Sequence, residues 1–345
     1  MFLKHSWYVA GFDHEINRTP LRRQLLGDWL VLYRLEDGTP VALKDQCPHR
    51  FLPLSRGKLV GDEIQCGYHG LTFDQSGQCT RVPTQEHVHK SVCVDSYTLH
   101  EKYGMVWLWH GDAALADEAL IPNWNIGPGL DHHTSDQWAS AKGYFAPKAS
   151  YSLVIDNLLD LSHIVYVHTS SFGSEDTNRA EMRSEVSDTA ISDYRFVPGG
   201  MPGPAFYGYV GDEKTPVDFW IDMHWQAPSN LLLEFGVTEP GRPRSEGFQW
   251  IASHLLTPKD ATSTHYFWVV SRCFDLDNDE HTQQWWHAVD GAFHEDHDVL
   301  EAQQIELGER ELLKDIKPLV FASDASAMKA RRIVKQLLEP QEAAS

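Results

Sequence analysis

The 345-residue sequence lacks any apolar run close to the roughly 20 residues that a membrane-spanning helix needs. Its first residues also contain no apolar stretch long enough for a secretory signal peptide. Cysteine is scarce, and an odd, widely spaced set of 5 does not form a disulfide framework. We therefore expect a protein of the reducing cytoplasm that does not insert into a membrane.

Basic residues are also few, since 29 Lys and Arg face 49 Asp and Glu and leave a net charge of −20. Such a surface repels phosphate backbones and anionic lipids, so we expect no nucleic-acid or membrane partner. A small acidic substrate is still compatible with this charge, because a local pocket can oppose the global field. The sequence has no glycine-rich dinucleotide loop either, so it offers no nicotinamide site of its own.

The length predicts two domains, at about 150 residues per domain. In the first part, short runs of aromatic and β-branched residues alternate with turn residues, which predicts a small antiparallel β-domain. These runs are residues 29–34, 41–43, 71–73 and 103–109. The strand signals stop between residues 111 and 122. We place the two domains at 1–112 and 113–345.

The second part mixes helix and sheet, which predicts an α+β domain. Residues 152–168 are mostly apolar and free of Gly and Pro, which favours a helix. Further helices are expected at 282–314 and 326–339. Four strands are expected at 218–226, 230–237, 247–256 and 263–274.

Two pairs of Cys and His lie in loops between the strand signals of the first part: Cys47 with His49, and Cys66 with His69. Two thiolates and two imidazoles can hold zinc, or a [2Fe–2S] cluster with the cysteines on one iron and the histidines on the other. In structural zinc fingers, Cys usually pairs with Cys along the chain and His with His. Because each loop here offers one of each, the spacing favours the cluster, which serves electron transfer.

A second group of potential metal ligands lies within residues 152–168. Asn157, Asp160 and His163 share one helical stripe, whereas His168 lies about 140° from His163 on an ideal helix. Both imidazoles reach one ion only if the helix ends, widens or bulges between them. Two His and one carboxylate with open positions form the facial triad of non-haem Fe(II) oxygenases. Because Asp160 is close to His163 in the sequence, it is a candidate for the carboxylate ligand of this triad.

The helix expected at 282–314 offers further carboxylates. Its apolar side chains repeat every seven residues: Phe293, Leu300 and Leu307. Asp296 lies within about 60° of the centre of this stripe, whereas Glu295 and Asp298 point roughly away from it. We expect Asp296 to face a buried metal, and Glu295, Asp298 and Glu301 to be solvated acids.

The strand expected at 247–256 places alternate side chains on one face. They are Phe248, Trp250, Ala252, His254 and Leu256. An aromatic face with one histidine suits a small aromatic substrate with a polar handle, which makes Trp250 and His254 candidate substrate contacts. A core histidine bonded to its neighbours is an equally good interpretation of His254. The candidate partners for a substrate carboxylate are Arg242, Arg244 and Arg272.

Several of these motifs resemble those of Rieske non-haem iron oxygenases. WYVA, CPHR, CGYHG and YGMVWLWHGD are similar to the Rieske domain, and DNLLDLSHIVYVH is similar to the iron-binding segment, particularly in the vanillate and dicamba O-demethylase branch. The family's E-D and L-E-x-Q pattern falls on 295–296 and 300–303 and also selects Asp296. The resemblance implies an N-terminal all-β Rieske domain and a C-terminal helix-grip-like antiparallel sheet with helices.

The resemblance also implies individual roles. The [2Fe–2S] ligands would be Cys47, His49, Cys66 and His69, and the mononuclear Fe(II) ligands would be His163, His168 and Asp296. Asp160 would link a Rieske histidine of a neighbouring subunit to an iron-binding histidine, and Asn157 would line the site without ligating firmly. Because the family's electron path crosses between subunits, the resemblance implies a homotrimer.

The implied activity is that of a terminal oxygenase in the catabolism of aromatic compounds. A separate reductase, directly or through a ferredoxin, would supply NAD(P)H electrons, and O₂ would hydroxylate or O-demethylate an aromatic acid. Three alternatives remain: a dioxygenase that forms cis-dihydrodiols, a Rieske electron-transfer protein and a zinc-stabilised binding module.

Overall fold

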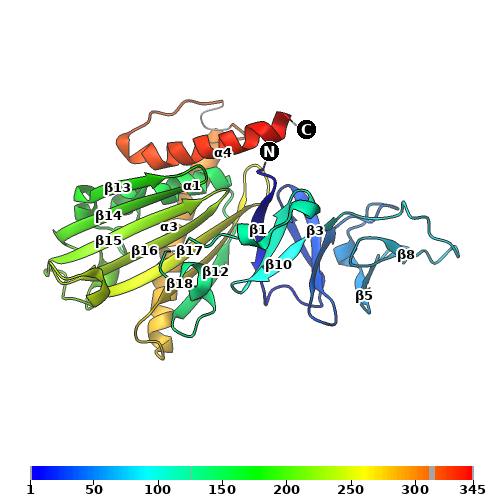
Figure 1. Cartoon of the computed structure of the whole chain (residues 1–345), viewed down its shortest axis with the longest axis horizontal. Helices are drawn as coiled ribbons and strands as arrows, with labels where there is room; N and C mark the ends of the chain where they lie inside the picture. Colours follow the sequence, from blue (N-terminus) through cyan, green and yellow to red (C-terminus); the bar gives the residue numbers. More distant parts are fainter. Residues whose placement is uncertain (1, 125, 311–314, 344–345) are drawn as a thin grey trace. The chain divides into compact units, whose positions relative to one another are not determined.

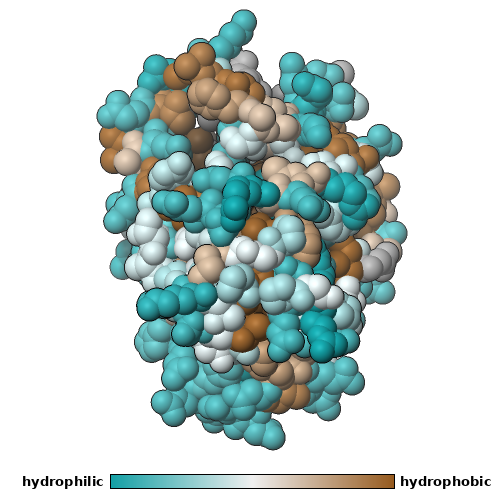
Figure 2. All heavy atoms as spheres, turned by 90° about the vertical axis from the view of Figure 1, so that its left-hand side faces the viewer, coloured by the Kyte–Doolittle hydropathy of each residue, from teal (hydrophilic) through white to brown (hydrophobic). Residues whose placement is uncertain are grey.

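The computed structural model describes residues 2–124, 126–310 and 315–343. The chain divides into two compact units, one formed by residues 1–121 with 257–260 and the other by residues 122–256 and 261–345 (Figure 1). The limits expected for the two domains stay a prediction. None of the helices in the described ranges is long and apolar enough to cross a membrane. Hydrophilic side chains dominate the face that Figure 2 shows, which suits the net charge of −20.

The first unit consists of short strands in three sheets, whose orders are β1-β11-β10, β2-β3-β4-β9 and β5-β6-β7-β8. The strands are β1 (Ser6–Phe12), β2 (Leu21–Leu25), β3 (Asp28–Arg34), β4 (Pro40–Lys44), β5 (Lys58–Val60), β6 (Glu63–Gln65), β7 (Thr72–Phe73), β8 (Cys79–Arg81), β9 (Ser96–Tyr97), β10 (Leu99–Lys102) and β11 (Met105–His110). The four expected segments are confirmed as β3, β4, β7 and β11. Apart from strands, the regular elements described in this unit are 3₁₀ turns, which confirms the all-β prediction.

The second unit is built on a seven-stranded antiparallel sheet with the order β12-β18-β17-β16-β15-β14-β13. Its strands are β12 (Ala139–Phe145), β13 (Glu181–Val186), β14 (Ala190–Gly200), β15 (Val217–Gln226), β16 (Asn230–Thr238), β17 (Phe248–Pro258) and β18 (Thr264–Arg272). The four expected strands are confirmed as β15 to β18. The sequence did not predict β12 to β14, because β13 is exposed throughout and β14 buries Asp193 and Arg195 at inward positions.

Three helices pack against this sheet around a shared apolar core (Figure 1). They are α1 (Tyr151–Leu159), α3 (Asp279–Leu307) and α4 (Ala325–Ala343). The inward stripe of α3 buries Phe293 and Leu300 among side chains of the sheet, as expected from the seven-residue repeat. This arrangement confirms an α+β unit with an antiparallel sheet.

The expected helix at 282–314 has different ends in the structure. It begins at Asp279 because the Asn278 side chain accepts a hydrogen bond from the backbone N–H of His281, which caps the first turn. It ends at Leu307, because Gly308 adopts φ +61° and ψ −129°, a conformation that favours glycine and cannot continue a helix. The expectation is therefore wrong for residues 308–310, and its last part, 311–314, lies outside the described residues.

The expected helix at 152–168 is interrupted. The helix α1 ends at Leu159, Asp160 adopts φ −99° and ψ 84°, and a 3₁₀ turn at Leu161–His163 leads into a short helix α2 (Ile164–Val167). The Asp160 side chain accepts a hydrogen bond from the N–H of Ser162 and so caps the new turn. The first break thus precedes both histidines. The short helix α2 then ends at Val167, so the helix also ends between His163 and His168, as expected.

Candidate metal centres

The two loops with Cys and His have the same backbone hydrogen bonds. In each, the Cys N–H donates to the carbonyl five residues later, and the Cys carbonyl accepts from the N–H four residues later. These two bonds measure 2.9 and 2.9 Å around Cys47, and 2.7 and 3.1 Å around Cys66. The fourth residue has a positive φ in both loops, +59° at Phe51 and +74° at Gly70. The two loops therefore present their donors as a matched pair.

The four side chains of these loops are arranged by type. Cys47 and Cys66 are buried, with 2% and 3% exposure, whereas His49 and His69 are exposed and their ring centroids lie 4.5 Å apart. Burial raises the pKa of Cys47 to about 11, and the neighbouring Cys66 thiol adds to this effect. The donor set fits a [2Fe–2S] group, which the two thiolates and two imidazoles would hold.

A second donor set lies in the C-terminal unit. Across the described ranges, a single group of three or more His, Cys, Asp or Glu has all its ligand atoms within 4.8 Å of one another: His163, His168 and Asp296. Asp160, which adjacency left open as the third ligand, is not in the group.

The carboxylate of Asp296 faces both imidazoles. Its Oδ1 lies 3.4 Å from Nε2 of His163, and its Oδ2 lies 3.3 Å from Nε2 of His168. Burial lowers the pKa of His163. Burial also acts on His168, but the carboxylates of Asp296 and Glu295 outweigh it and raise the pKa of that imidazole. Two nitrogens and a carboxylate aimed at one point fit a divalent iron with open positions.

The break after α1 supplies the contacts around this group. The main-chain carbonyl of Asp160 accepts a hydrogen bond of 2.6 Å from Nδ1 of His163, which leaves Nε2 free to face the metal position. Asn157, on the last turn of α1, donates from Nδ2 to Oδ1 of Asp296 over 3.1 Å. The stripe predicted from Asn157, Asp160 and His163 therefore surrounds the site, although the helix that carried the prediction does not continue.

Two acids on α3 that were expected to be solvated are partly exposed, at 36% for Glu295 and 28% for Glu301, and each also has a hydrogen-bond partner in the protein. Glu295 accepts a hydrogen bond of 2.8 Å from Nδ1 of His168, and Glu301 accepts from the N–H of Lys148 over 2.9 Å. Asp298 is exposed, as expected. The sequence signal that was missed is the demand of a metal-binding histidine for an acceptor at its second nitrogen.

The predicted substrate contacts are both buried. His254 is 2% exposed, lies 5.5 Å from the ring of Phe293 between centroids, and has Nδ1 2.5 Å from the hydroxyl of Tyr266. Its Nε2 is buried without a hydrogen-bond partner among the described residues. Burial lowers the pKa of His254 to about 3, which the Asp296 carboxylate only partly opposes, so the imidazole is neutral. One nitrogen of His254 is thus satisfied in the core and the other is not, and a role of His254 in substrate binding stays a prediction.

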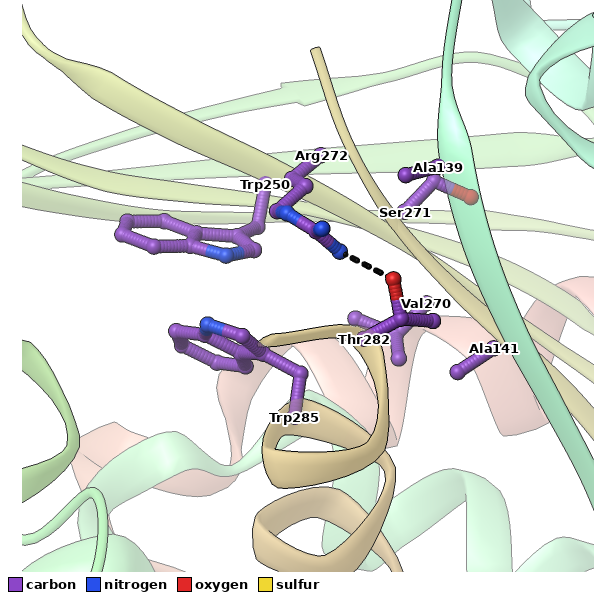
Figure 3. A pocket seen from close by; sticks show the side chains of 8 residues that line it. All are labelled: Ala139, Ala141, Trp250, Val270, Ser271, Arg272, Thr282 and Trp285. Carbon is purple, nitrogen blue, oxygen red and sulfur yellow. Dashed lines mark hydrogen bonds between the residues drawn. The ribbon is translucent and has the colours of Figure 1, made fainter. Parts of the chain in front are cut away.

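Trp250 lines a cavity near the start of α3. Its indole lies 4.5 Å from that of Trp285 between ring centroids, and the two face each other beside Arg272 (Figure 3). The lining residues are Ala139, Ala141, Trp250, Val270, Ser271, Arg272, Thr282 and Trp285. Arg272 donates to Thr282 Oγ1 over 2.7 Å and to carbonyls before α3, so it anchors the start of that helix.

The other two candidate arginines pair with acids. Arg242 lies 3.5 Å from a carboxylate oxygen of Glu246, and Arg244 donates to buried Asp222. The structure therefore brings one of the three, Arg272, to the aromatic cavity.

We predict that Gly173→Ala weakens the mononuclear iron site. A Cβ at residue 173 would lie 2.7 Å from the carbonyl oxygen of His168 and 2.8 Å from that of Ile164, so the turn that holds His168 must shift. A displaced ligand should lower iron affinity on the order of tenfold. Iron per chain after dialysis measures this, with the cluster absorption as internal reference. Gly291→Ala, whose Cβ meets nothing within 4 Å, is the control. An equal iron content in both variants would show that the turn tolerates the methyl group.

Family models and known proteins match nearly the whole chain. A Rieske [2Fe–2S] domain model matches residues 6–98, and a model of the vanillate O-demethylase oxygenase C-terminal domain matches residues 148–340. The dicamba O-demethylase oxygenase component of Stenotrophomonas maltophilia is 35% identical over 97% of this chain and 98% of that protein. The vanillate O-demethylase oxygenase subunit of Pseudomonas sp. (strain HR199 / DSM 7063) is 34% identical over 100% and 97%. A crystal structure of dicamba monooxygenase bound to dicamba superimposes with a TM-score of 0.87 and 35% identity, covering 100% of this chain and 99% of that one.

Proposed function

Because the chain belongs to the Rieske non-haem iron oxygenases, we propose that it hydroxylates or O-demethylates a small aromatic acid. It is an oxygenase component of the monooxygenase and O-demethylase type, whose cofactors are a [2Fe–2S] cluster and a mononuclear iron that uses O₂. The match to an oxygenase domain overturns the alternatives of an electron-transfer protein and a zinc-stabilised module. The dicamba and vanillate O-demethylase components among its relatives favour this activity over the formation of dihydrodiols.

The proposed ligands follow from the two separate donor sets, and these sets are the observation that carries the function. Cys47, His49, Cys66 and His69 hold the cluster. His163, His168 and Asp296 hold the iron, which supplies open positions for O₂ when bound. Support comes from the exposed imidazole pair in one unit and the buried triad in the other.

Asn157 and Asp160 complete the proposed machinery. Asn157 orients the Asp296 carboxylate through its 3.1 Å hydrogen bond. Asp160 relays electrons from a Rieske histidine of a neighbouring subunit to His163, which its own carbonyl contacts. This relay needs a homotrimer, in which a separate reductase, directly or through a ferredoxin, feeds the cluster. We place the protein in the cytoplasm, because an odd, widely spaced set of 5 cysteines suits a reducing compartment.

The proposed substrate is an acid because His254 is a hydrogen-bond donor. Burial raises the pKa of Tyr266, so its hydroxyl keeps its proton, and His254 Nδ1 is the partner described for it. If this hydroxyl donates to Nδ1, the neutral ring carries its own proton on Nε2. The reverse assignment would leave both the Tyr266 proton and the Nε2 lone pair buried without partners, which costs more. A buried Nε2–H then demands an acceptor, which a carboxylate on an aromatic ring supplies.

We predict that Tyr266→Phe raises KM for the acid about tenfold and leaves kcat within about twofold. Without the hydroxyl, the His254 proton can move to Nδ1, and a hydrogen bond to a charged group of about 1.5–3 kcal/mol is weakened. The control is Tyr144→Phe, because Tyr144 bonds His265 on the opposite face of β18. Steady-state kinetics with a methoxybenzoate and with its methyl ester measure KM and kcat of each variant. A KM that rises equally for the acid and its ester would contradict the donor assignment.

The activity itself is tested with the protein carrying both metals and a compatible reductase. Methoxylated and methylated aromatic acids are screened for NADH consumption and for formaldehyde, the product of O-demethylation. We expect substrate-dependent NADH consumption with formaldehyde and a phenol from at least one methoxylated acid. A cis-diol product, or no response to any acid with both metals loaded, would refute the proposal.

A further inference from the structure

The imidazole of His168 is held at both of its nitrogens by neighbouring acids of one helix. Its Nε2 lies 3.3 Å from Oδ2 of Asp296, and its Nδ1 lies 2.8 Å from Oε2 of Glu295. Consecutive residues of α3 point about 100° apart. Asp296 therefore faces the metal position, while Glu295 reaches the opposite side of the His168 imidazole. Both acids belong to the same rigid helix, which fixes the imidazole between them.

Glu295 is itself held on the side away from His168. Its Oε1 accepts a hydrogen bond of 3.3 Å from the hydroxyl of Ser170, two residues after His168. The Glu295 side chain is 36% exposed, whereas that of Asp296 is 8% exposed. The carboxylate therefore lies at the edge of the site, where it reaches the imidazole without entering the metal position.

The two imidazoles of the triad differ in the acceptor behind them. His163 donates its Nδ1–H to the neutral main-chain carbonyl of Asp160, whereas His168 donates to a carboxylate. A carboxylate partner fixes the tautomer, orients the ring and makes the opposite nitrogen a stronger metal ligand. The pair is thus chemically unequal although both histidines face the same carboxylate.

We propose that Glu295 is a positioning residue of the mononuclear iron site, which holds His168 as the stronger of the two imidazole ligands. This inference rests on the proposed assignment of His168 as an iron ligand. Glu295 acts through His168 and does not touch the metal position.

The test compares Glu295→Ala and Glu295→Gln in the full-length protein with its cluster intact. After chelation of the mononuclear iron, each variant is titrated with Fe(II), and with Co(II), whose visible spectrum reports the ligand field. We expect Glu295→Ala to weaken Fe(II) binding about 10–100-fold and to shift the Co(II) spectrum, since it removes the acceptor of the His168 proton. Glu295→Gln keeps a neutral acceptor and should fall between Glu295→Ala and the unmodified protein. The cluster absorption should not change.

Asp298→Ala is the matched control, because it removes the same charge from the same helix at an exposed position. Its iron affinity should stay within about twofold of the unmodified protein, as for other exposed positions. Equal affinities of Glu295→Ala and Asp298→Ala would overturn the inference, and so would an unchanged Co(II) spectrum in Glu295→Ala. If Glu295→Ala does not fold, an affinity of Glu295→Gln equal to that of the unmodified protein would overturn it as well.

His168→Ala separates this inference from the ligand assignment beneath it. If that variant binds iron normally, the proposed assignment of His168 fails. If it loses iron while Glu295→Ala does not, the assignment stands and the role of Glu295 alone is refuted.

Discussion

An Asp296→Ala variant is expected to lose its mononuclear iron and to keep the visible absorption of the [2Fe–2S] cluster. Asp296 is the anionic member of the triad, and both imidazoles face its oxygens at 3.3–3.4 Å. Disturbing a ligand's hydrogen-bond partner costs about 10–100-fold in metal affinity, so removal of the ligand itself should cost at least about 100-fold. Metal analysis of the purified protein and its absorption spectrum measure the two centres separately.

The cluster serves as the internal reference for this prediction. Its proposed ligands belong to the N-terminal unit, whereas Asp296 belongs to the C-terminal one. Thermal unfolding would reveal a variant that loses its iron because the C-terminal unit misfolds. Iron stoichiometry equal to that of the unmodified protein would exclude Asp296 as a ligand.

An Asp160→Asn variant is expected to bind both metals and to turn over far more slowly than the unmodified protein, because the proposed electron relay loses its carboxylate. The asparagine oxygen can still accept from the N–H of Ser162, and the main-chain carbonyl still holds His163. Only the negative charge of the proposed relay is lost. Stopped-flow reoxidation of the reduced cluster, with O₂ and substrate present, measures the step.

Metal analysis is the control for this second prediction, because a slow variant with an empty iron site would say nothing about electron transfer. Asp160→Ala should behave differently, since it also removes the cap of the turn at residues 161–163. Full turnover of Asp160→Asn with both centres loaded would contradict the relay role.

The sequence predicted best where apolar residues form clear runs or a regular helical stripe. The strands β15 to β18 were found because they are nearly continuously buried and bounded by clear turns. Helix phase alone placed Asp296 inward, and the structure brings it to His163 and His168, the histidines chosen from the earlier segment. These successes rest on local periodicity, which the fold preserves.

The failures arose where a side chain satisfies the backbone or a distant partner. Asp160 was read as one position of a helical stripe, but its carboxylate caps a new turn and ends the helix. Glu295 was expected to face solvent, and its side chain is 36% exposed, but its contact with His168 was missed. Periodicity cannot reveal either contact, because both depend on which partner the fold brings near.

The interruption after Leu159 has a consequence for the protonation of the iron site's histidines. In an uninterrupted helix, the carbonyl of Asp160 would be committed to the N–H of Ile164, which here donates to Leu161 instead. That carbonyl is released, and it fixes which nitrogen of His163 bears hydrogen. A kink in the main chain thus decides the protonation pattern of a side chain, so any change that straightens this segment should disable iron capture even with every ligand present.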